Sequence, residues 1–66
     1  MTYEQQKQWA SDVLGDLNLA IRQKKRIHKR YVKHGAVKSA AELAIEIESM
    51  ETELQCEQEL FDLTFN

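Results

Sequence analysis

The sequence predicts an all-α protein built as one antiparallel two-helix hairpin. Three observations predict this fold class: apolar residues recur at three- and four-residue spacing along two long segments, a glycine separates the segments, and none of the 66 residues is proline. A chain of this length forms at most one small domain. We therefore expect residues 1–66 to form a single hairpin with a helix over 3–34, a turn over 35–38, a helix over 40–62 and a short C-terminal tail.

The first helix is predicted to begin with a capping box, because Thr2 is followed three residues later by Gln5. Its end is predicted at His34 and Gly35, since glycine readily takes the left-handed conformation that closes a helix. Val37 is expected to pack back onto the last turn. The apolar face between these limits is interrupted by one charged residue, Lys24, and consists of Ala10, Val13, Leu14, Leu17, Ala20, Ile21, Ile27, His28 and Tyr31.

The second helix is predicted to begin near residue 40, because Ser39 and Glu42 have the spacing of another capping box. A linker of about five residues makes the two helices antiparallel neighbours. Aromatic side chains are then expected to gather at the open end of the hairpin: Tyr3, Trp9, Phe61 and Phe65. The apolar face of the second helix contains Leu43, Ile47, Met50, Leu54 and Phe61.

Three apolar residues, Ile45, Leu60 and Leu63, fall outside that face, and they share the flank and back of the second helix with Cys56, which is expected to be half-buried. Isolated exposed apolar residues are common on protein surfaces and need no special explanation. A core in so small a chain, however, rarely supplies more than about 3–5 kcal/mol, and a single cysteine forms no internal disulfide. We therefore expect a homodimer with a four-helix core, and these four residues form the possible oligomer surface.

The net charge of −2 hides a strong segregation of charge. Eight of the nine Lys and Arg residues lie between Arg22 and Lys38, and eight of the eleven acidic residues lie between Glu42 and Asp62. Helix macrodipoles favour part of this arrangement. On the face turned away from the second helix, the heptad positions predict a basic stripe that would contact a partner: Arg22, Lys25, Arg26, Lys29 and Lys33.

The basic stripe also suggests the alternative function, a nucleic-acid-associated regulator that contacts phosphates. The acidic second helix and the lack of aromatic residues on the basic face oppose this alternative. A membrane partner is not expected, because the longest apolar runs are three residues and the apolar face is already committed to the hairpin. The N-terminal residues do not have the pattern of a secretory signal, so we expect a cytoplasmic protein.

The sequence contains no constellation of residues that would support catalysis. It has no glycine-rich phosphate loop, no nucleophile elbow and no Glu-x-x-His pair. His28 and His34 are six residues apart and do not share a helical face; His28 is expected beside the core and His34 at the end of the first helix. We therefore expect no enzyme activity, no cofactor and no metal.

In size, hairpin organisation and lack of an enzymatic motif, the whole chain resembles the small accessory proteins encoded in the exo-xis region of lambdoid phages. The resemblance implies a phage protein that alters host physiology or the balance between lysis and lysogeny by binding a host or phage protein. It assigns no functional residues. The resulting prediction is a small non-enzymatic protein–protein interaction module.

Overall fold

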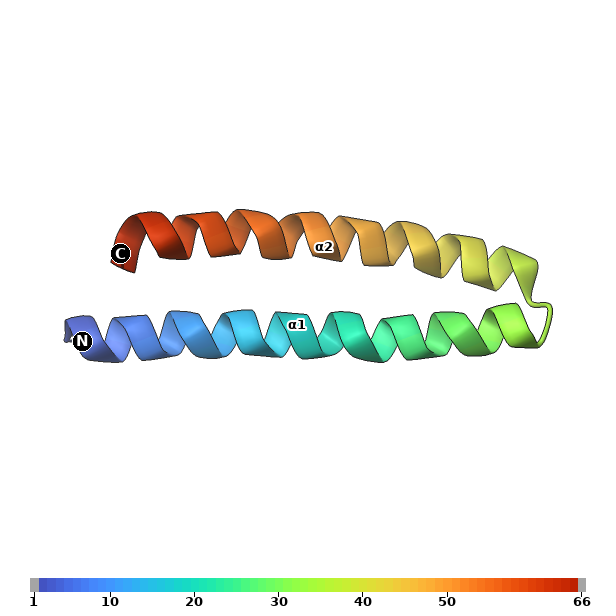
Figure 1. Cartoon of the computed structure of the whole chain (residues 1–66), viewed down its shortest axis with the longest axis horizontal. Coiled ribbons are helices and arrows are strands. Elements are labelled where there is room, and N and C mark those ends of the chain that lie inside the picture. Colours follow the sequence, from blue (N-terminus) through green and yellow to red (C-terminus); the bar gives the residue numbers. More distant parts are fainter. Residues whose placement is uncertain (1, 66) are drawn as a thin grey trace.

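The computed structural model describes residues 2–65, which form two helices, α1 (Tyr3–Lys33) and α2 (Val37–Phe65). The helices lie side by side and run in opposite directions, with the turn at one end and both chain ends at the other (Figure 1). The rod measures 49 × 15 × 14 Å along its principal axes. The predicted all-α hairpin is confirmed, whereas its dimerisation into a four-helix bundle stays a prediction.

The predicted capping box begins α1. The Gln5 backbone N–H donates to Thr2 Oγ1 at 3.2 Å, and the Thr2 backbone N–H donates to Gln5 Oε1 at 3.1 Å. Two backbone groups that the first turn leaves without helical partners are thereby satisfied. The helix therefore begins at Tyr3, as the sequence predicts.

The turn is closed by Gly35, which has a φ of +74°. The Gly35 N–H donates to the Val32 carbonyl oxygen at 3.2 Å, and the Ala36 N–H donates to the Tyr31 carbonyl oxygen at 2.9 Å. These two bonds form a Schellman motif, which satisfies carbonyl groups at the end of α1. His34 is the C-cap residue, so its expected place at the end of the first helix is confirmed.

The beginning of α2 differs from the prediction. The helix starts at Val37 instead of residue 40, and the Ala40 N–H already donates to the Ala36 carbonyl oxygen at 2.9 Å. Ser39 and Glu42 therefore lie inside the helix, and the second capping box was wrong. The physical reason is the compact Schellman turn, which reverses the chain within residues 34–36 and leaves no linker to be capped. Val37 is also 77% exposed, so it does not pack onto α1.

The far end of α2 also extends beyond the prediction. The helix continues to Phe65 instead of ending at residue 62, and the remaining tail residue lies outside the described part of the chain. The Phe65 ring lies 5.0 Å from the Phe61 ring and 5.6 Å from the Tyr3 ring, measured between centroids. Trp9 lines a cavity of about 150 Å³ together with both phenylalanines. The expected aromatic gathering at the open end is thus present, with Trp9 at its edge.

The core of the hairpin is narrow. Within residues 2–65, only Ile21, Ala40 and Ile47 are buried. Val13 and Ile27, assigned to the apolar face of α1, are 37% and 40% exposed, because a second helix of this diameter covers only the centre of that face. Flanking the buried residues along the contact are half-buried side chains: Ala10, Leu14, Leu17, Ala20, Lys24, His28, Leu43, Met50 and Leu54.

The rod exposes more surface than a compact protein of its mass. Its solvent-accessible area is 5361 Å², whereas a folded monomer of the same mass exposes about 4,300 Å². The excess, about 1,000 Å², exceeds the roughly 800 Å² that each partner contributes to an average protein–protein interface. The exposed area beyond that of a compact monomer is therefore as large as the area that one partner would cover.

Candidate functional site

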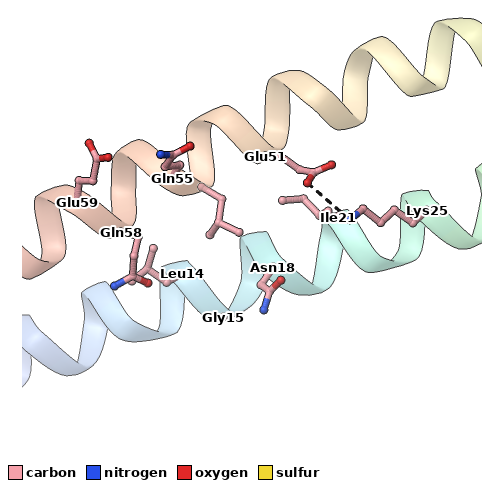
Figure 2. A pocket seen from close by; sticks show the side chains of 10 residues that line it. Leu14, Gly15, Asn18, Ile21, Lys25, Glu51, Gln55, Gln58 and Glu59 are labelled. Atoms are coloured by element: carbon pink, nitrogen blue, oxygen red, sulfur yellow. Dashed lines mark ion pairs between the residues drawn. The ribbon is translucent and has the colours of Figure 1, made fainter.

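A groove between the helices forms one candidate surface. A cavity of about 500 Å³ lies over Leu14, Ile21 and Leu54, and a second of about 230 Å³ lies nearer the turn. Lys25 and Glu51 line both cavities, and Lys25 Nζ lies 3.6 Å from Glu51 Oε2 (Figure 2). This ion pair therefore bridges the groove and divides it in two.

Lys24, the charged residue within the apolar face of α1, forms an ion pair with α2. Lys24 Nζ lies 2.7 Å from Glu46 Oε1 of α2. The aliphatic part of the lysine can cover apolar surface while its ammonium group reaches the edge of the hairpin. Lys24 thus fits the helix contact without leaving a buried charge, and its 32% exposed side chain agrees with that position.

The predicted basic stripe is only partly correct in its geometry. Lys25 was placed on the face turned away from the second helix, but its ion pair with Glu51 shows that it reaches α2. The error arises because Lys25 lies at the border of the helix contact, where a long side chain can bend across the groove. The remaining members of the stripe are exposed and take part in neither ion pair of the described residues: Arg22, Arg26, Lys29 and Lys33.

The structure divides the possible oligomer surface into two parts. Leu60 is 57% exposed and lines the cavity at the open end with Trp9 and Val13, so it lies beside α1. Ile45 and Leu63 are 70% and 83% exposed, and neither lines that cavity nor the groove. They lie on the outside of α2, with Cys56 between them in the sequence.

Cys56 is an exposed free thiol, so its expected half-buried position was wrong. It occupies a heptad position on the outside of α2, where α1 covers nothing.

Sequence reasoning missed two residues that connect Ile45 to Cys56. Ser49 and Thr52 are exposed and follow at steps of four and three, so they lie on the same outward face. The Thr52 hydroxyl donates to the Glu48 carbonyl oxygen at 3.0 Å, which satisfies its polar group within the helix. We call this surface the outer stripe of α2 and define it by Ile45, Ser49, Thr52, Cys56 and Leu63. The spacing is present in the sequence, but the side chains at its centre are polar and therefore do not belong to an apolar pattern.

The described residues offer no metal centre. Within residues 2–65, no three His, Cys, Asp or Glu side chains lie where they could hold a metal ion together. His28 is half-buried and lines the smaller groove cavity, as expected beside the core, while His34 is exposed at the end of α1. In the same part of the chain, neither helix combines the length and apolar character needed to cross a membrane.

The fold and these surfaces define the class of protein: a two-helix antiparallel hairpin with an interhelical groove, a basic face on α1 and an outer stripe on α2. No family model, curated protein or solved structure matches this chain.

Proposed function

We propose that this hairpin is a small non-enzymatic protein–protein interaction module that works by packing against further helices. The observation that carries the proposal is the excess of exposed surface over a core of only three buried residues within 2–65. Burial of apolar surface is the main favourable term in protein association, and apolar side chains such as Val13, Ile27 and Ile45 are 37%, 40% and 70% exposed, so a partner that covers them stabilises a complex. The resemblance to accessory proteins of lambdoid phages agrees with such a role, in which a host or phage protein is the partner.

A homodimer is the first form of this proposal. Val13, Ala20 and Ile27 recur every seven residues along one side of α1, and Leu60 of α2 lies on the same side near the open end. Val13 and Ile27 are more than a third exposed in the single hairpin. A second copy placed over this side would bury them and produce a four-helix bundle.

Light scattering at about 10 µM protein tests the homodimer, because self-association depends on concentration. The unmodified chain is expected to show twice the monomer mass, and Ile27→Glu is expected to reduce the measured mass to that of a monomer. The matched control is Leu19→Glu, which adds the same charge at a residue that is 54% exposed. A monomer mass for the unmodified chain would contradict the homodimer and leave a foreign partner as the remaining form of the module.

Retention of partners from a bacterial lysate, with and without nuclease, tests the module itself. The immobilised chain is expected to hold a discrete protein that remains after nuclease treatment. Retention that disappears with nuclease would contradict the proposal.

A nucleic-acid-associated regulator is the second candidate, favoured by one observation. Arg22, Arg26, Lys29 and Lys33 are exposed on α1 and outside the hairpin's ion pairs, so they are free to contact phosphates. Four phosphate contacts predict that affinity falls about 10²-fold between 50 and 200 mM salt. A gel shift that shows this loss, and that Arg26→Glu abolishes, would favour the second candidate. Absence of a shift at every salt concentration would remove it.

A further inference from the structure

The outer stripe of α2 is a second helix-packing face on the side opposite the core. Its members follow at steps of four, three, four and seven residues, which is the pattern that keeps side chains on one face of a helix. Ile45 and Leu63 mark its ends and are 70% and 83% exposed. At 1.5 Å per residue, the stripe is about 27 Å long.

Between these ends the stripe carries small, uncharged side chains. Thr52 satisfies its hydroxyl on the Glu48 carbonyl oxygen, so this polar group needs no partner outside the helix. Ser49 and Cys56 are small enough to let another helix approach closely. The stripe therefore combines two large apolar ends with a shallow centre.

Carboxylates border the stripe along both sides. Glu42 and Glu53 lie on one border, and Glu48 and Glu59 lie on the other, as their three- and four-residue offsets from the stripe require. None of these four takes part in the ion pairs to Lys24 and Lys25. No basic residue follows Lys38 in the sequence, so nothing on α2 beyond its first turn offsets this charge.

From this arrangement we infer that the outer stripe of α2 binds a basic amphipathic helix of another protein. Such a helix places apolar residues against Ile45 and Leu63 while lysine or arginine residues on its borders meet the four carboxylates. This inference rests on the proposed function and adds the chemistry of the partner.

A second copy of this chain does not fit the outer stripe. Packing α2 against α2 would bring the two carboxylate borders together, which is repulsive. The outward face of α1 carries Arg26 and Lys33 along its centre, with Arg22 and Lys29 beside them, where the stripe requires apolar side chains. An anionic lipid surface or a nucleic acid is excluded from this face for the same electrostatic reason.

Cys56 provides a local reporter for this surface, because it is the only cysteine and its thiol is exposed. The probe is a synthetic helix of about 18 residues made of leucine and lysine, with leucines at three- and four-residue spacing. At about ten times its dissociation constant, the probe is expected to slow alkylation of Cys56 by uncharged iodoacetamide about tenfold. A scrambled peptide of the same composition and a leucine–glutamate peptide of the same pattern are expected to give no protection.

Two variants locate the contact. Leu63→Glu and Ile45→Glu place a charge at either end of the stripe, and each is expected to weaken probe binding at least about tenfold at unchanged helix content. Leu19→Glu on the outward side of α1 is the matched control and is expected to bind normally. Having one variant at each end keeps the test valid if one of them alters the fold.

The outcomes separate this inference from the proposed function. Binding of the probe without protection of Cys56, or equal protection by the scrambled or leucine–glutamate peptide, would overturn the inference and leave the module in place. Protection of Cys56 that grows with protein concentration and needs no peptide would assign the outer stripe to a second copy and also overturn it. A monomer that binds no probe and retains no protein would contradict both the inference and the proposed function.

Discussion

The Tyr3 hydroxyl donates a hydrogen bond of 3.0 Å to the carbonyl oxygen of Phe65, which lies 62 residues further along the chain. The same two residues also place their rings edge to face, with an interplanar angle of 63°. One side chain therefore joins the first turn of α1 to the last turn of α2. The bond satisfies a carbonyl group that the end of α2 leaves without a helical partner.

Replacing Tyr3 by phenylalanine removes this bond and keeps the ring. We expect Tyr3→Phe to lower the free energy of unfolding by about 0.5–1 kcal/mol, because the bond is exposed to water. Urea denaturation followed by circular dichroism measures the change. Tyr31→Phe is the control, since the Tyr31 hydroxyl forms no hydrogen bond with any residue of the described range 2–65. An equal loss in both variants would contradict the role of the Tyr3 bond.

Replacement by alanine is expected to have opposite effects on stability at the two glycines. Gly35 has a φ of +74°, so Gly35→Ala is expected to destabilise the hairpin by about 1–2 kcal/mol. Gly15 lies inside α1 with open space around its Cβ position, so Gly15→Ala is expected to stabilise it by up to about 1 kcal/mol. Thermal and urea denaturation of both variants test the pair. Loss of stability in Gly15→Ala would show that the glycine serves a contact beyond the single hairpin.

Ile45 and Ile47 lie two residues apart on opposite faces of α2. Ile47 is 7% exposed, so Ile47→Ala is expected to cost about 2–5 kcal/mol. Ile45 is 70% exposed, so Ile45→Ala is expected to change stability by less than about 0.5 kcal/mol. If Ile47→Ala does not fold, Ile47→Val provides the measurement, with an expected cost of about 0.5–1.5 kcal/mol. Equal costs at the two positions would contradict the assignment of the core face.

The ion pair across the groove predicts a small coupling. Lys25 and Glu51 are each about half exposed, so we expect a coupling energy of about 0.2–1 kcal/mol at most. A double-mutant cycle with Lys25→Met and Glu51→Gln measures it. The coupling is expected to shrink further in 1 M salt, where the screening length is about 3 Å. A coupling that is insensitive to salt would show that the pair is more shielded than its exposure indicates.

Local sequence signals predicted much of the fold because the interactions themselves are local. Thr2 and Gln5 form their capping box within one turn, and Gly35 closes α1 through bonds that span no more than six residues. The start of α2 was not predictable in the same way. Ser39 and Glu42 have the spacing of a cap, but the geometry that places Val37 in the helix is set by the preceding turn.

The candidate surfaces depend on how the two helices face one another, which periodicity alone does not determine. The side chain of Lys25 reaches Glu51 only because α2 lies beside it, and Cys56 is exposed because α1 covers a narrow part of α2. The outer stripe was overlooked for another reason. Its centre is formed by Ser49 and Thr52, and the Thr52 hydroxyl becomes satisfied only when the Glu48 carbonyl oxygen is placed by the helix.

Both chain ends lie at one end of the rod, opposite the turn (Figure 1). The helices are joined only at their ends, whereas the contacts between them run along their length. They can therefore pack in the same way when they are connected in the other order. A circularly permuted chain, with a short glycine linker joining the present ends and new ends at Gly35, loses the bonds of the turn but is expected to keep the contacts between the helices. In that chain the hairpin points the opposite way relative to any fused domain, and the turn end becomes the point of attachment.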